Sequence, residues 1–312
     1  MLPEKIQELL EKQKYRLVGT HSAVKVCYWT KQSLTTGRVC YKELWYPGVK
    51  SHRCMEMTPF LGCNYRCSYC WRIHSDDRPG YSWKEFPVEL QKIDEPSFII
   101  DEATRQRKKL LIGLKGNPKV DKKKLEEALE PTMLTLSLTG EPTLYPRLDE
   151  LIGEAKRRSM TTFLVTNGSL PEVLEKLSNL PTQLYVSVSG ADRETYLSLA
   201  RPVIKDAWER FSRTLELLPS LNTRKVLRLT MVKGYNMKNP ELYAKLIEKA
   251  EPTYVEVKAY EWVGESQKRL PKSAMPYMED IEAFAKEISK LTSYSIGGSF
   301  EPSGVVMLKK QV

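Results

Sequence analysis

Apolar runs of strand length alternate with stretches of helical period along most of the chain. Six such runs predict strands at Met55–Leu61, Met133–Thr139, Thr161–Thr166, Leu184–Ser189, Val226–Val232 and Tyr254–Tyr260. Between them, helical patterns occur at Leu148–Arg158, Glu172–Leu180, Ala207–Leu218 and Pro240–Ala250. Strands that alternate with helices pair in parallel through right-handed crossovers. The pattern therefore predicts an α/β fold, a partial, TIM-like (β/α)6 barrel that is short of the eight strands of a full barrel.

Three further segments lie outside this alternation. An amphipathic pattern predicts a helix at about Pro3–Tyr15, and residues 17–53 have the pattern of short strands and turns. Residues 84–130 form a long insertion after the first strand, helical and basic in its middle part, and Tyr294–Leu308 predicts one or two further strands. We expect an N-terminal extension, a barrel and C-terminal strands, at residues 1–54, 55–293 and 294–312.

Positive charge is concentrated in two segments. The chain has 49 Lys and Arg against 39 Asp and Glu, a net charge of +10. Residues 1–54 and residues 101–125 each carry a net charge of +6, which leaves the rest of the chain slightly acidic. A single basic run is commonly a solvated helix face, but two concentrated runs favour a docking surface for a polyanion.

Composition excludes several classes of protein. Hydrophobic residues make up 41% and charged residues 28% of the chain, enough apolar material for a core and too much for a disordered protein. No uninterrupted apolar run reaches the length that a membrane-spanning helix needs. The N-terminus lacks the apolar segment of a secretory signal, so we expect a cytoplasmic protein.

All the cysteines lie near the N-terminus, within the first 70 residues. A cytoplasmic protein rarely uses cysteines in disulfides, so metal ligation is the better interpretation. Cys63, Cys67 and Cys70 form a C-x3-C-x2-C loop directly after the first predicted strand. Three thiolates on one loop can bind three corners of a cubane iron–sulfur cluster and leave one iron open to a small chelating ligand. Zinc is the alternative, although a zinc site usually needs a fourth protein ligand.

This loop resembles that of the radical S-adenosylmethionine (SAM) superfamily, in which an aromatic residue, here Tyr69, precedes the last cysteine. Thr139-Gly140-Glu141-Pro142 is similar to the superfamily's GGEP motif, with Thr139 in place of the first glycine. The resemblance implies that Cys63, Cys67 and Cys70 hold a [4Fe–4S] cluster. It also implies a set of residues that bind SAM: Gly140, Glu141, Asn167, Ser187, Ser189 and Arg228.

A second set of cysteines comprises Cys27, Cys40 and Cys54, spaced by thirteen and fourteen residues. Such spacing requires ligands from three separate strands or turns. They could be buried structural cysteines, because cysteine is often an inert core residue. Three of them beside an iron–sulfur loop favour a second [4Fe–4S] cluster with another open iron.

Further stretches give the whole chain a resemblance to the tRNA 4-demethylwyosine synthases. They are Tyr41-Lys42, Leu44–Pro47, Met57-Thr58-Pro59, Val255–Tyr260, Gly264–Ser266 and Met275-Pro276-Tyr277. The resemblance implies a radical SAM carbon–carbon lyase that condenses N1-methylguanosine-37 of tRNA(Phe) with two carbons of pyruvate to give 4-demethylwyosine. Eukaryotic members carry a flavodoxin-like domain before this region. There is no room for one before Cys27, so we expect the shorter archaeal form, a monomer that depends on a separate electron donor.

Lys42 is the candidate for capture of pyruvate as an imine. If Val39–Glu43 is extended, its side chains alternate, and Lys42 shares a face with Cys40. That arrangement would place an amine beside a ligand of the second cluster. Two other classes of function stay open: a radical SAM enzyme with an auxiliary cluster that modifies a peptide or another protein, and a zinc-containing RNA-binding module.

Overall fold

The computed structural model describes residues 3–87, 90 and 92–311, which form two compact units. The first comprises Met1–Cys63, Arg78–Val165 and Ser178–Thr182, and the second Asn64–Asp77, Thr166–Leu177 and Gln183–Val312. Positions 88, 89 and 91 of the predicted insertion, and residues 1, 2 and 312 of the terminal segments, lie outside the described residues. No helix in the described ranges combines the length and the apolar character needed to cross a bilayer.

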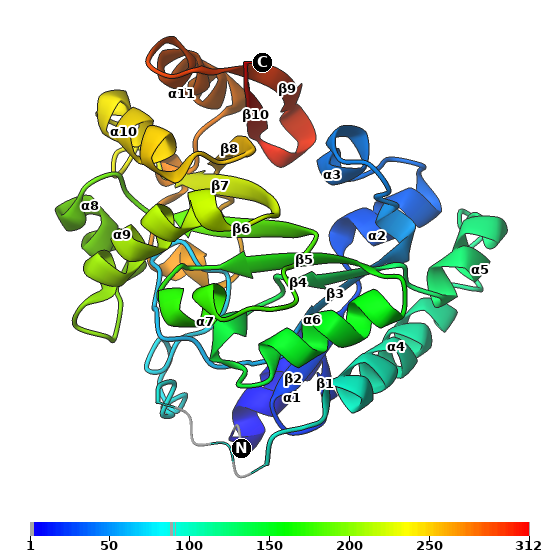
Figure 1. The fold of residues 1–312 in the computed structure, drawn as a ribbon. Helices are drawn as coiled ribbons and strands as arrows, with labels where there is room; N and C mark the ends of the chain where they lie inside the picture. The colour runs from blue at the N-terminus through cyan, green and yellow to red at the C-terminus, as the bar shows by residue number, and fades with distance from the viewer. Residues whose placement is uncertain (1–2, 88–89, 91, 312) are drawn as a thin grey trace. The chain divides into compact units, whose positions relative to one another are not determined.

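The first unit is built on five strands in the order β1-β2-β3-β4-β5 (Figure 1). The pairs β1/β2 and β2/β3 are antiparallel, whereas β3/β4 and β4/β5 are parallel. The strands are Arg16–Val18 (β1), Ser22–Lys25 (β2), Cys54–Thr58 (β3), Met133–Leu136 (β4) and Thr161–Thr166 (β5). The helices are Glu4–Lys12 (α1), Tyr28–Thr35 (α2), Tyr41–Trp45 (α3), Pro96–Ile112 (α4), Lys122–Leu129 (α5) and Leu148–Arg157 (α6).

The second unit has five strands in the order β6-β7-β8-β10-β9. Strands β6, β7 and β8 are parallel, and β10 and β9 extend this sheet in antiparallel pairing. The strands are Gln183–Val188 (β6), Arg224–Met231 (β7), Tyr254–Ala259 (β8), Tyr294–Phe300 (β9) and Val305–Lys310 (β10). The helices are Pro171–Glu175 (α7), Arg193–Ala200 (α8), Ala207–Leu217 (α9), Pro240–Ala250 (α10) and Met278–Lys290 (α11).

All six predicted central strands are present as β3 to β8, and the two C-terminal strands are β9 and β10. All four residues of β4 are buried, and so are five of the six residues of β6. Strands covered on both faces give continuous apolar runs, which is why the sequence pattern located them.

The prediction for residues 17–53 is wrong in part, because α2 and α3 are helices where short strands and turns were expected. Leu34 of α2 packs in one cluster with Leu111 and Leu125, which come from the helices α4 and α5 of the insertion. Residues of the extension thus share a core with the insertion. Helix α2 is short and has few apolar positions, so its periodicity alone could not reveal it.

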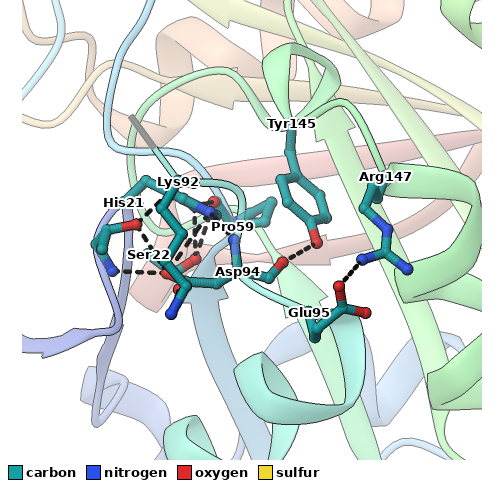
Figure 2. Close-up of polar contacts among 9 residues, drawn as sticks. His21, Ser22, Pro59, Lys92, Asp94, Glu95, Tyr145 and Arg147 are labelled. Atoms are coloured by element: carbon teal, nitrogen blue, oxygen red, sulfur yellow. Dashed lines mark hydrogen bonds and ion pairs between the residues drawn. The ribbon is translucent and has the colours of Figure 1, made fainter. Parts of the chain in front are cut away.

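His21 joins the end of β3 to the insertion (Figure 2). Its Nδ1 lies 2.6 Å from the carbonyl oxygen of Pro59, and its Nε2 lies 3.0 Å from the backbone nitrogen of Asp94. A carbonyl can only accept and an amide can only donate, so the ring carries its proton on Nδ1. The Asp94 carboxylate accepts a hydrogen bond from the backbone N–H of Thr20 at 2.6 Å. The backbone carbonyl of Asp94 accepts one from the Tyr145 hydroxyl at 2.7 Å. This network fixes the start of α4 against the end of β3, just before the cysteine loop.

Candidate active site

The structure brings the second set of cysteines together within the first unit. Cys27 and Cys40 directly precede α2 and α3, and Cys54 is the first residue of β3. Burial raises the pKa of the Cys27 thiol well above its usual value, and the negative charges of Glu56, Cys54 and Cys40 add to the effect. Cys40 and Cys54 therefore both lie within electrostatic range of Cys27.

All six cysteines lie in the described part of the chain, are partly exposed and form no disulfide there. Among the described residues, no group of three or more His, Cys, Asp and Glu side chains is arranged to hold a single metal ion. A cubane differs from a single ion because each thiolate binds a different iron. Its ligands need not converge on one point, so three thiolates that face different irons can bind a cluster of this kind.

Lys42 lies in helix α3, not in an extended segment, so the expectation that it alternates with Cys40 along a strand is wrong. Its amine nevertheless reaches the same region. Nζ lies over the ring of Phe163, 5.0 Å from the centroid, and its charge acts on the Cys54 thiol and on the Glu56 carboxylate. The helix thus places the amine within electrostatic range of Cys54 and Glu56, and the role of Lys42 stays a prediction.

Glu56 was missed by the sequence analysis. It lies two residues after Cys54 in β3, and side chains two residues apart share a face of a strand. Burial raises the pKa of the Glu56 carboxyl, while the positive charges of Lys42 and Lys25 oppose the shift. The period-two relation to Cys54 was a signal that could have found it.

The residues that lead into the cysteine loop are held by the Thr-Gly-Glu-Pro motif. Gly140 has φ +72°, and an added Cβ would stand 2.1 Å from the carbonyl oxygen of Phe60. The backbone N–H of Glu141 donates to the carbonyl of Gly62 at 2.9 Å. Glycine is required here because only it combines this φ with such a close approach. The buried Glu141 carboxylate is oriented by Thr143, whose hydroxyl and backbone N–H donate at 2.6 and 3.1 Å.

Within the second unit, Asn167 and Ser189 contact the cysteine loop. The side-chain amide of Asn167 donates to the side-chain oxygen of Asn64 at 2.9 Å. The hydroxyls of Tyr69 and Ser189 are 2.6 Å apart. Burial and the neighbouring Cys67 raise the pKa of the Tyr69 phenol well above its usual value, so the phenol stays protonated. The aromatic residue of the motif is therefore fixed by one of the predicted SAM-binding residues.

Ser187 and Arg228 are direct neighbours in the sheet, and Arg228 is in turn opposite Glu256. The Arg228 guanidinium pairs with the fully buried Glu256 carboxylate at 3.0 Å and lies over the Tyr185 ring, 4.4 Å from its centroid. These contacts fix the plane of the guanidinium. Glu256 was missed, although it belongs to the quoted stretch Val255–Tyr260.

Arg269 was also missed, and it holds the second half of the cysteine loop. Its guanidinium donates to the carbonyls of Ser68, Cys70 and Arg72 and pairs with Asp77. Nearby, the backbone N–H of Glu265 donates to the carbonyl of Trp71 at 3.0 Å. Gly264 permits this approach, since an added Cβ would lie 2.4 Å from the same carbonyl oxygen. No local pattern links Arg269 to a loop about two hundred residues earlier.

Comparisons with known proteins agree with this geometry. Residues 57–247 match the radical SAM superfamily model, and residues 249–310 match a model described as wyosine base formation. The S-adenosyl-L-methionine-dependent tRNA 4-demethylwyosine synthase of Pyrococcus horikoshii is 50% identical over 314 residues, which cover 99% of this chain and 90% of that protein. The Homo sapiens protein of the same name, TYW1, is 36% identical over 310 residues, 99% of this chain and 41% of its own length.

Solved structures give the same result. A structure of TYW1 with a lysine–pyruvate adduct bound superposes with a TM-score of 0.87 at 35% identity, covering 99% of this chain and 97% of that one. A crystal structure of archaeal TYW1 gives a TM-score of 0.80 at 32% identity, with the same coverage. The predicted fold class and resemblance are confirmed, and the chain belongs to the radical SAM superfamily and, within it, to the tRNA 4-demethylwyosine synthases.

Proposed function

We propose that the protein converts N1-methylguanosine at position 37 of tRNA(Phe) to 4-demethylwyosine, joining two carbons of pyruvate to the methyl carbon and the exocyclic nitrogen. The observation that carries the proposal is the position of Lys42, whose amine lies over the Phe163 ring and within electrostatic range of Cys54, a member of the second set of cysteines. A solved relative holds a lysine–pyruvate adduct. Family membership favours this reaction over a protein-modifying enzyme or a zinc-containing module.

Members of the radical SAM superfamily use SAM and a [4Fe–4S] cluster. We assign that cluster to Cys63, Cys67 and Cys70, which form no disulfide and whose thiols supply the soft ligands that iron–sulfur clusters take. When bound there, the cluster and SAM supply a 5′-deoxyadenosyl radical that removes hydrogen from the unactivated methyl group. The chain's own task is to orient the cofactor against the substrate and to exclude water.

Specific residues fit the polar groups of SAM. The Glu141 carboxylate, already oriented by Thr143, is suited to an ammonium group. The Arg228 guanidinium, held by Glu256, is suited to a carboxylate. Ser187 shares this edge, and Asn167 and Ser189 hold the loop residues Asn64 and Tyr69. Gly140 keeps the backbone at the start of the loop in place.

We assign a second cluster to Cys27, Cys40 and Cys54. In the absence of a metal, burial holds the pKa of Cys27 and Cys54 above the usual thiol value. Thiolates there need a cation among them, and iron supplies it. Lys42 would then capture pyruvate near this cluster: its neutral amine attacks the ketone carbon, a C=N bond forms and water leaves. The ring of Phe163 lies against the amine, with its centroid 5.0 Å from Nζ.

Recognition of tRNA is assigned to the basic segments. Lys122 and Lys123 are exposed on the first turn of α5, whereas Arg107 of the same basic run is buried and contributes nothing to a docking surface. Position 37 lies next to the anticodon, in a single-stranded loop whose bases can be presented to an enzyme. We further infer that the protein acts as a monomer and takes its electrons from a separate donor.

One assay tests the proposal directly. The protein is reconstituted with iron and sulfide without oxygen and incubated with SAM, pyruvate, a reductant and tRNA(Phe) carrying N1-methylguanosine. Nucleoside mass spectrometry should detect 4-demethylwyosine, with two labelled carbons from labelled pyruvate. The loaded protein should contain about eight irons per chain if both clusters form. tRNA without the methyl group serves as the control. A loaded protein that cleaves SAM and leaves the methylated tRNA unchanged would contradict the proposal.

A further inference from the structure

Arg107 is a buried arginine whose hydrogen bonds to the described residues go to neutral groups. It lies in α4, its side chain is 1% exposed, and its guanidinium donates to three backbone carbonyls, those of Cys54, His52 and Ala128. Within the described part of the chain, no Asp or Glu carboxylate forms an ion pair with it. Its hydrogen bonds are satisfied, but its charge is not balanced.

Such a charge is costly unless an anion lies nearby. The carbonyl of Ala128 lies in the last turn of α5, where the helix dipole is negative, so part of the charge is compensated. The remaining interactions that favour the charged guanidinium come from Cys54 and Cys27.

The two cysteines compensate Arg107 only when they are thiolates. Binding of a cluster converts them to thiolates and adds net negative charge. The counter-charge that Arg107 lacks is therefore the one that the proposed second cluster brings.

We propose that Arg107 is the built-in counter-ion of the second cluster, a positioning residue that holds Cys54 by its carbonyl and favours the reduced cluster through its charge. The inference rests on the proposed assignment of a cluster to Cys27, Cys40 and Cys54. A cation near an iron–sulfur cluster stabilises the added electron and raises the reduction potential. Loss of the charge lowers the potential, whereas a purely packing role leaves it unchanged.

The test uses full-length protein carrying Cys67→Ala, so that only the second cluster gives a signal. The potential is measured by a redox titration followed by electron paramagnetic resonance. Arg107→Met should shift the reduction equilibrium about tenfold toward the oxidised cluster, which is about 59 mV for a one-electron couple. Arg107→Lys keeps the charge and should stay nearer the parent. Arg105→Met is the matched control, since Arg105 lies on the same helix, is exposed and pairs with Glu102.

The outcomes separate this inference from the proposed function. A parent that binds no iron at the second set overturns the second cluster and Arg107's role with it. A parent that binds iron, with an equal potential in Arg107→Met, overturns the role of Arg107 alone. If Arg107→Met stays folded by circular dichroism but takes up no cluster while Arg107→Lys does, the counter-ion role is supported. If Arg107→Met does not fold, the comparison passes to Arg107→Gln, and an unchanged potential there is equally decisive against the proposal.

Discussion

The amine of Lys42 lies over the aromatic ring of Phe163, 5.0 Å from its centroid, and its charge acts on the Cys54 thiol. We expect Lys42→Arg to retain both clusters and SAM cleavage but to lose the tricyclic product by at least about a hundredfold. Guanidinium stays protonated and is a poor nucleophile, so it cannot form the imine. Nucleoside mass spectrometry measures the product, and borohydride trapping with labelled pyruvate should mark a peptide that contains Lys42.

Lys50→Arg is the matched control for this substitution. Lys50 lies in the same N-terminal segment, but its side chain is 61% exposed and pairs with Glu43. The control should trap pyruvate on the Lys42 peptide as the unaltered protein does. Full product formation by Lys42→Arg would reject the imine role.

The two sets of cysteines should be separable by substitution. Cys67→Ala should abolish formation of 5′-deoxyadenosine, since only the C-x3-C-x2-C loop matches the SAM-binding pattern. Cys40→Ala should leave some uncoupled SAM cleavage and make no 4-demethylwyosine. Each variant should bind about four irons, half of the full content. Formation of 5′-deoxyadenosine by Cys67→Ala would mean that the two clusters are assigned the wrong way round.

Lys122, Lys123 and Lys124 form the first turn of α5, where positive charge opposes the helix dipole. Such charges do not stabilise the helix, which favours a role in binding. Replacing all three with Gln should weaken tRNA binding and flatten the slope of log K against log salt by roughly 0.7 to 0.9 per lost phosphate contact. The melting temperature should stay the same or rise slightly, and SAM binding should not change. An unaltered slope would identify this turn as a solvated helix face.

Gly140→Ala should destabilise the protein through a backbone effect and a steric effect. The same substitution at a second glycine, Gly37, distinguishes the two. The left-handed conformation at φ +72° costs an alanine about 1–2 kcal/mol, and the added Cβ would also collide with the Phe60 carbonyl. Gly37 has a similar φ of +75° with no atom near its Cβ position, so Gly37→Ala reports the backbone cost alone. Chemical denaturation should give a larger loss for Gly140→Ala. Equal losses would show that the cysteine loop relaxes away from the methyl group.

The central strands could be predicted because a strand that is buried on both faces consists of a continuous apolar run, as in β4 and β6. The cysteines and the Thr-Gly-Glu-Pro motif were recognisable because their chemistry is local. Lys42 was expected in an extended segment but lies in α3, because a helix of five residues leaves no clear period in the sequence. Arg107 and Arg269 could not be found this way, because each acts on carbonyls of distant segments and carbonyls have no sequence signature.

The Arg269 guanidinium donates to three carbonyls of residues 68–72, in the second half of the cysteine loop and just after it, and it also pairs with Asp77. Arg269→Lys keeps the charge but cannot reach all four acceptors, so it should cost about 1–3 kcal/mol of stability. Hydrogen exchange in the metal-free protein should accelerate at the amides of residues 68–72. The reconstituted variant should lose iron from this loop while retaining about four irons at the second set. Lys268→Met is the control, since Lys268 is exposed and pairs with Glu265. If exchange at residues 68–72 were equally slow in Arg269→Lys, the loop would hold its shape without the guanidinium, and Arg269 would not be what positions Cys70.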